Sequence, residues 1–236
     1  MTDGGFPGWM TDTAALYARA FRRGAALALR NWPVGLVVVG YGALLVVVGF
    51  LSAPLGFVGG VLVYVASVAC ASSWLSLVAQ VIRSGRVRFA DLPAGFTAYL
   101  GDLLAVGFFL WLLSMVDALV LGPFPLVHIV FVLATFVFLN AVPELVYLGR
   151  HPAAELLVES YRFIGENWIE WFPPQFVLAA CIAAAAVLLP AGPYGLVANA
   201  AVGVVLYFAM IVRGLLFVEL STSSRRARAF QRRAGG

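Results

Sequence analysis

PVGLVVVGYGALLVVVGFLSAPLG, residues 33–56, contains no charged side chain. An α-helix rises about 1.5 Å per residue, so about 20 apolar residues cross the roughly 30 Å hydrocarbon core of a bilayer. The stretch ends in a short segment rich in small residues and proline (52–56), and another apolar stretch follows directly. The pattern predicts two membrane-spanning helices joined by a tight turn.

Similar apolar stretches recur along the chain. Of the 236 residues, 63% are hydrophobic and only 11% are charged, whereas soluble domains carry about 25% charged residues. We therefore expect an all-α, polytopic membrane protein that forms a single integral membrane domain over residues 1–236. The six predicted spans are about Trp32–Leu51, Gly56–Gln80, Leu103–Leu121, Leu126–Tyr147, Phe172–Leu189 and Tyr194–Val212.

The connections between these spans alternate in charge. Three are short, uncharged and rich in proline and glycine, at 52–56, 122–125 and 190–195. The other segments hold nearly all of the 15 basic residues, every one of which is an arginine. Because arginine-rich segments remain in the cytoplasm, both termini are predicted there, and the six spans form three hairpins in a bacterial inner membrane.

The segments before the first and third hairpins end alike. The first ends in Arg30-Asn31-Trp32-Pro33, and the third contains Asn167-Trp168 and then Trp171-Phe172-Pro173. Tryptophan favours the membrane–water interface, and proline favours the first turn of a helix. We therefore expect helices to enter the membrane at Pro33 and at Pro173.

Two of these segments, 13–31 and 152–171, are predicted to be amphipathic helices on the cytoplasmic surface. Arg19, Arg23 and Arg30 share one face of the first, opposite Tyr17, Phe21, Gly24 and Ala28. The second carries an acidic face of Glu155, Glu159, Glu166 and Glu170, with Arg162 among them, opposite Leu157, Tyr161, Ile164 and Trp168. Such helices either cap the bundle or dock a partner. For the acidic face, the candidate partners are the arginine-rich first segment, the tail and another membrane or cytoplasmic protein.

The tail, 221–236, is strongly basic. Juxtamembrane basic clusters attract anionic lipid headgroups, so we expect lipids to be partners and nucleic acid not to be one. The residues predicted to contact headgroups are Arg213, Arg225, Arg226, Arg228, Arg232 and Arg233.

The few charges within the spans lie near predicted boundaries. Asp117 and His128 flank the turn at 122–125, where they form either a protonatable couple or a hydrogen bond that closes the hairpin. Glu144 and Arg213 reach similar depths near the cytoplasmic side and form a second candidate pair. Since intramembrane proton relays need ionisable groups at depth, this placement argues against charge-coupled transport.

Motifs for enzymatic chemistry are absent. The sequence holds no GxSxG, P-loop or HExxH motif and no cluster of cysteine and histidine, so no catalytic, metal or cofactor site is predicted. Two functions remain open. The first is a non-enzymatic accessory or scaffold component of a membrane assembly. The alternative is a permease or lipid-handling transporter subunit, which predicts a cavity lined by Ser72, Ser76 and Asn140.

Several short segments resemble those of prokaryotic six-span proteins similar to the membrane domain of glycerophosphodiester phosphodiesterases. The segments are RNWP (30–33), RSGRVRF (83–89) with Phe96–Gly101, and PEL (143–145), LLVES (156–160) and ENW (166–168). The resemblance covers most of the chain. It implies a membrane protein without hydrolase activity, because the catalytic phosphodiesterase domain is not in this sequence.

Overall fold

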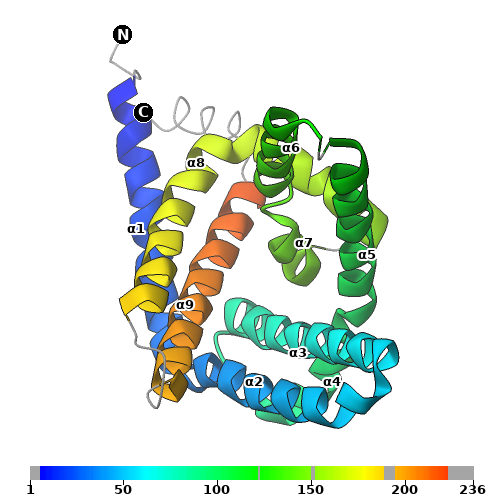
Figure 1. The fold of residues 1–236 in the computed structure, drawn as a ribbon. Coiled ribbons are helices and arrows are strands. Elements are labelled where there is room, and N and C mark those ends of the chain that lie inside the picture. The colour runs from blue at the N-terminus through cyan, green and yellow to red at the C-terminus, as the bar shows by residue number, and fades with distance from the viewer. Residues whose placement is uncertain (1–5, 122, 150–151, 189–194, 223–236) are drawn as a thin grey trace. The chain divides into compact units, whose positions relative to one another are not determined.

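A computed structural model describes residues 6–121, 123–149, 152–188 and 195–222, and Figure 1 shows their fold. Every regular element in these ranges is helical, as the sequence predicts, and the ranges contain no strand. The elements are α1 (Phe6–Arg30), α2 (Pro33–Ser52), η1 (Ala53–Leu55), α3 (Phe57–Ser84), η2 (Phe89–Asp91), α4 (Leu92–Ala98), α5 (Leu100–Val116), η3 (Asp117–Leu121), α6 (Pro125–Phe138), α7 (Val142–Leu148), α8 (Ala153–Leu188) and α9 (Gly195–Thr222).

Five helical stretches among the described residues are long and apolar enough to cross a membrane: Pro33–Leu55, Phe57–Ser84, Leu100–Leu121, Pro125–Leu148 and Ala200–Thr222. This finding indicates a multi-pass membrane protein. The first four correspond to the first four predicted spans. The last corresponds to the sixth predicted span, but it continues past the predicted end at Val212. The fifth predicted span, Phe172–Leu189, begins within α8 and reaches residues outside the described ranges.

Proline and glycine set several helix ends. Pro33 and Pro125 occupy the first positions of α2 and α6, where the missing N–H costs no helical hydrogen bond. Between η1 and α3, Gly56 has φ +54°, a value that residues with a Cβ rarely adopt. The short link at 52–56 therefore turns where the sequence predicts.

α8 is one helix of 36 residues from Ala153 to Leu188. It joins the segment predicted to lie on the membrane surface to the beginning of the fifth predicted span. Pro173 and Pro174 lie inside this helix, so the predicted helix start at Pro173 is wrong. Prolines within membrane helices are tolerated when neighbouring groups satisfy the freed carbonyls.

The described residues fall into two compact units. Unit 1 comprises those of Met1–Ala43, Leu77–Arg88 and Asn167–Gly236, and unit 2 those of Leu44–Ser76 and Phe89–Glu166. In unit 1, α9 supplies much of the buried apolar surface: Tyr207, Ala209, Met210, Ile211, Val212, Leu215, Leu216, Phe217 and Leu220.

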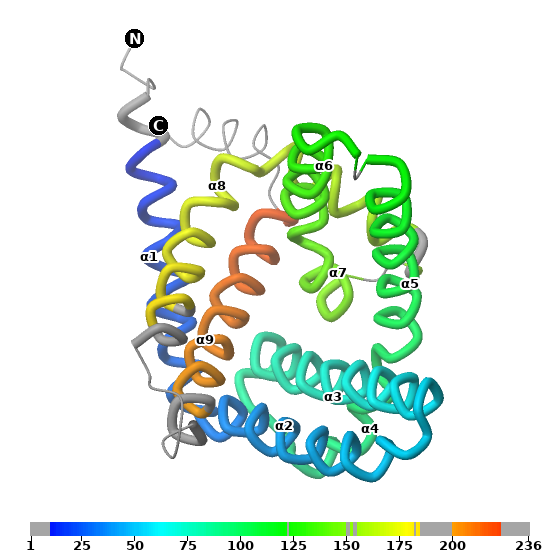
Figure 2. The backbone as a smooth tube through the Cα atoms, viewed as in Figure 1, coloured from blue at the N-terminus to red at the C-terminus, as the bar shows by residue number. Residues whose placement is uncertain are grey.

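Within unit 1, α1 runs antiparallel to α9, and the two lie side by side in Figures 1 and 2. Arg19 contacts Glu219, and further along α1 Gly24 faces Val212. A Cβ at Gly24 would meet Val212 Cγ2 at 2.7 Å, so glycine is needed for this close approach. The buried face of α1 is Leu16, Ala20 and Gly24, spaced one turn apart. Small residues at that spacing bring membrane helices together.

Asn31 fixes the junction between α1 and α2. Its Nδ2 donates to the carbonyl oxygens of Leu27 and Gly85, at 3.0 and 3.1 Å, and its Oδ1 accepts from the Val87 amide at 3.1 Å. The side chain is 7% exposed. The RNWP segment is thereby bound to the glycine-containing loop after α3, and both segments have a structural role.

In unit 2, buried serines attach α4 to α3. The Ser72 hydroxyl donates to the Gly95 carbonyl oxygen and accepts from the Tyr99 amide, both at 2.8 Å. Ser73 Oγ donates to the Leu92 carbonyl oxygen at 3.2 Å. These bonds satisfy backbone groups at both ends of a seven-residue helix that is too short to be stable alone.

Candidate functional site

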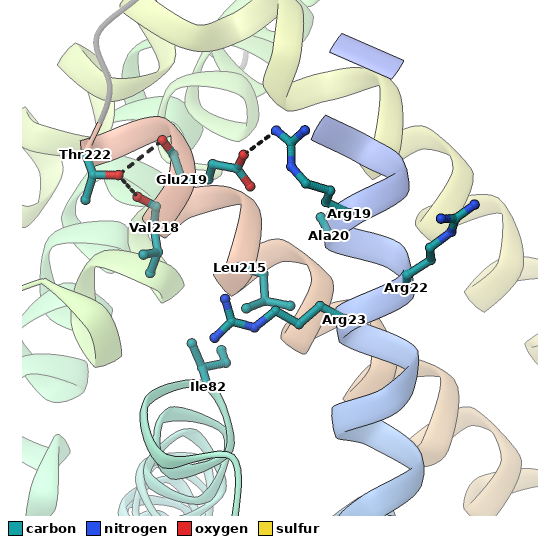
Figure 3. Close-up of a pocket in the computed structure, with 9 residues that line it drawn as sticks. All are labelled: Arg19, Ala20, Arg22, Arg23, Ile82, Leu215, Val218, Glu219 and Thr222. Atoms are coloured by element: carbon teal, nitrogen blue, oxygen red, sulfur yellow. Dashed lines mark hydrogen bonds and ion pairs between the residues drawn. The ribbon is translucent and has the colours of Figure 1, made fainter. Parts of the chain in front are cut away.

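A basic pocket of ≈ 650 Å³ lies in unit 1, between α1, the end of α3 and the last two turns of α9. Figure 3 shows its lining residues: Arg19, Ala20, Arg22, Arg23, Ile82, Leu215, Val218, Glu219 and Thr222. We call this feature the basic pocket. Its volume lies within the roughly 300–1,000 Å³ range of small-molecule sites.

The arginines come from the same part of α1 that packs on α9. Ala20 and Gly24 face α9, so Arg19 and Arg23, each one position earlier, emerge beside the contact. Figure 3 shows the Arg23 side chain crossing toward Leu215 and Ile82, while the Arg22 guanidinium points away from Glu219. The helix packing therefore places two of the guanidinium groups over the pocket.

The charges in the basic pocket are unbalanced. Arg19 Nη2 donates to Glu219 Oε1 at 2.7 Å, and these side chains are 62% and 38% exposed. Among the residues that the structure describes, Arg22 and Arg23 make no ion pair or hydrogen bond through their side chains. The lining of the basic pocket includes three arginines and one carboxylate, and the excess positive charge suits an anion.

The lining of the pocket also has an apolar part. Ala20, Ile82 and Leu215 are 3%, 6% and 7% exposed, so their side chains are packed in place before any ligand arrives. The pocket thus combines exposed cations with a buried apolar wall.

Neighbouring α8 carries a polar contact to α1. The Tyr17 hydroxyl donates to the backbone oxygen of Glu170 at 3.0 Å. Burial, and then the negative charge of Glu170, raise the pKa of Tyr17 to about 12. The phenol is therefore a neutral donor throughout the physiological range.

Arg213 is half-buried against α8. Its Nη1 donates to Gln175 Oε1 at 3.1 Å, and its guanidinium carbon lies 5.2 Å from the centre of the Trp171 ring. Planar guanidinium groups suit this combination of stacking and hydrogen bonding. Glu144, the partner predicted for Arg213, is fully buried on α7 in unit 2.

The structure brings Asp117 and His128 together. His128 Nδ1 lies 2.9 Å from Asp117 Oδ1, so the bond joins η3 to the first turn of α6. The His128 side chain is 45% exposed and that of Asp117 is 14% exposed. η3 is a π-helix, a local widening that often accompanies functional positions.

The predicted acidic face of α8 is divided. Glu155 and Glu166 are exposed, and Glu159, 29% exposed, accepts from Arg162 Nη1 at 2.7 Å. Glu170 is only 4% exposed. One candidate partner of this face was the arginine-rich α1. Arg19 of α1 instead pairs with the carboxylate of Glu219 on α9.

The predicted apolar face of the same segment is also divided. Ile164 is buried, but Tyr161 and Trp168 are 58% and 54% exposed. Leu156 and Phe163 are buried, so the packed face of this part of α8 is rotated from the predicted one.

Other predicted residues lie outside the sites described. Arg225, Arg226, Arg228, Arg232 and Arg233 fall outside the described residues. The polar cavity predicted for a transporter has no counterpart in the basic pocket, because Ser72 is occupied by two backbone groups and neither Ser76 nor Asn140 lines that pocket.

The basic pocket was missed by sequence reasoning. The helical spacing of Arg19 and Arg23 was visible, but their relation to Glu219 joins positions 200 residues apart. The one local signal was Ala20-xxx-Gly24, a small-residue spacing typical of helix packing. That signal marks which face of α1 is packed, and hence where the arginines emerge.

Comparisons with protein families, curated proteins and solved structures found no match for this chain. Among the described residues, no three histidine, cysteine, aspartate or glutamate side chains gather as a metal site would require. The geometry of the described residues is therefore the basis for any functional assignment.

Proposed function

We propose that this chain is a non-enzymatic protein of a bacterial inner membrane that serves as an accessory or scaffold component of a membrane assembly. In this proposal six spans form three hairpins, and both termini lie in the cytoplasm. Five candidate spans and the arginine-rich segments between predicted hairpins support the arrangement.

The exposed surface of the first half of α8 carries the proposal. Glu155 and Glu166 are exposed there, beside Val158 and Tyr161, which are 51% and 58% exposed. This surface lies outside the five candidate spans. Exposed aromatic and apolar groups among charges are typical of protein interfaces, and the acidic residues favour a basic partner.

The serines of the candidate spans favour a scaffold over a polar substrate path. Ser52, Ser67 and Ser114 donate to carbonyl oxygens three or four residues earlier in the chain. Ser72 and Ser73 bind the backbone around α4. All five hydroxyl groups thus donate to backbone carbonyl oxygens, so their protons are not available to a solute.

One observation favours the alternative, a permease or lipid-handling subunit: the basic pocket joins cationic and apolar walls. Reconstitution in liposomes separates the two functions. Movement of a solute or lipid by the purified chain alone would contradict the scaffold proposal.

The scaffold proposal is tested by affinity capture of the full chain from membranes in mild detergent. A defined partner should be recovered with the native chain and lost when Glu155 and Glu166 are both changed to Lys. Gly165→Ala, on the same helix with open space around it, is the matched control and should retain the partner. Recovery that survives the double charge reversal would show that the α8 surface is not the docking site.

A further inference from the structure

We propose that the basic pocket binds the phosphate of an anionic phospholipid headgroup. The inference rests on the proposed function in one respect, the membrane location of the chain. It adds a defined lipid site that includes Arg19 and Arg23, two residues outside the predicted set of headgroup contacts.

The first support is charge. Phosphate groups in protein sites are bound by guanidinium groups, which present several N–H donors in a fixed plane. Arg23 reaches across the pocket toward Ile82 and Leu215 in Figure 3 and, among the described residues, makes no ion pair. Arg19 lines the same pocket and offers a second guanidinium while it is bound to Glu219.

The second support is the apolar wall. Ile82 and Leu215 are buried, and Val218, 40% exposed, extends the same wall toward the open side of the pocket. A soluble anion gains nothing from such a surface. A phospholipid places its phosphate beside the beginning of its acyl chains, so one end of the molecule contacts arginine and the other contacts aliphatic side chains.

The third support is position along α9. Leu215, Val218, Glu219 and Thr222 belong to the last turns of a candidate span that ends at Thr222. Arginine side chains at a span end extend toward the headgroups. The Thr222 hydroxyl donates to the Val218 carbonyl oxygen at 2.8 Å and so helps to close this helix end.

Glu219 has a specific part in this arrangement. Its carboxylate occupies Arg19 and repels an incoming phosphate, so it weakens the site that the arginines create. The proposal therefore predicts opposite effects from neighbouring substitutions. Arg23→Gln should weaken lipid binding, whereas Glu219→Gln should strengthen it.

The experiment uses the full purified chain in a neutral detergent. Native mass spectrometry counts retained lipid after addition of phosphatidylglycerol or, in a parallel sample, phosphatidylcholine of the same acyl chains. We expect preferential retention of phosphatidylglycerol, a loss of about fivefold in Arg23→Gln, and a gain in Glu219→Gln, since one charge near a lipid surface changes binding by about that factor. Arg162→Gln removes the same charge from exposed α8 and is the matched control, with no expected change.

Several results would overturn the proposal. They are equal retention of the two lipids, equal losses in Arg23→Gln and Arg162→Gln, and displacement of phosphatidylglycerol by millimolar inorganic phosphate, which would assign the pocket to a soluble anion. If Arg23→Gln does not fold, the sign of the Glu219→Gln effect decides. The lipid-binding assay needs no protein partner. If affinity capture contradicts the scaffold proposal, the lipid-binding result therefore still stands.

Discussion

Replacing Gly24 with alanine tests the packing that builds the basic pocket. The new methyl carbon would lie 2.7 Å from Val212 Cγ2, about 1 Å inside the optimal carbon–carbon separation of roughly 3.5–4.0 Å. Val212 is fully buried, so its side chain has little room to move. Overpacking of this kind costs about 1–3 kcal/mol, while alanine in place of glycine in a helix gains about 1 kcal/mol.

The expected sum is a loss of up to about 2 kcal/mol in the free energy of unfolding. Reversible denaturation in detergent micelles, followed by tryptophan fluorescence, measures it. Gly165→Ala, with nothing within 4 Å of the added carbon, should instead stabilise by up to about 1 kcal/mol.

A double-mutant cycle makes the reasoning specific to one contact. Val212→Ala removes the atom that the new methyl group would strike, so Gly24→Ala should be neutral or stabilising in that background. The expected coupling energy is about 1–2 kcal/mol, within the range for residues in direct contact. If Gly24→Ala stabilises the chain as Gly165→Ala does, α1 is not packed closely on α9 and the geometry of the basic pocket is wrong.

Three further predictions concern polar contacts. Tyr17→Phe should lower the free energy of unfolding by about 1 kcal/mol. The pKa of Tyr17 in the folded chain, about 12, exceeds the ordinary 10.0, so the native chain should lose stability as the pH rises from 10 toward 12, whereas the variant should not. Unfolding titrations of both chains across this pH range will measure the difference. Ser72→Ala leaves the buried Gly95 carbonyl and the part-buried Tyr99 amide without their partner, so the free energy of unfolding measured by denaturation should fall by about 2 kcal/mol. Ser67→Ala removes a hydroxyl that bonds only within its own helix and should change that free energy by less than about 0.5 kcal/mol. Arg213→Leu strips the donor from Gln175 Oε1 and should lower the unfolding free energy by about 2 kcal/mol, with partial recovery in Arg213→Lys; no effect would contradict the observed contact.

Helix type and most span positions were predictable because they depend on local composition. An uncharged apolar stretch and a terminal proline are visible in a few consecutive residues, and α2 begins at Pro33 as its sequence predicts. The continuation of α8 through Pro173 was not predictable on the same basis. Proline is normally a poor interior residue, and only surrounding groups decide whether the helix survives it.

The two Asn-Trp pairs are similar in sequence, but the backbone around them differs. Asn31 and Asn167 are 7% and 4% exposed, whereas Trp32 and Trp168 are 58% and 54% exposed, so the burial pattern repeats. The backbone does not repeat, because a helix ends before Asn31 and continues through Asn167. The similarity predicts which side chain is buried, but it does not predict the helix break, where the Asn31 side chain bonds the Gly85 carbonyl oxygen.

Arg213 shows why counting along a span gives an incomplete account of a charge. The count placed it just beyond the predicted span end at Val212, free to reach headgroups. The candidate span instead continues to Thr222, and α9, with 28 residues, is about 42 Å long, longer than the roughly 30 Å hydrocarbon core. Depth alone therefore does not fix the environment of Arg213. Its partners do: the Trp171 ring and Gln175 Oε1 hold the guanidinium between two helices. A charge held in this way contributes to the packing of α9 against α8.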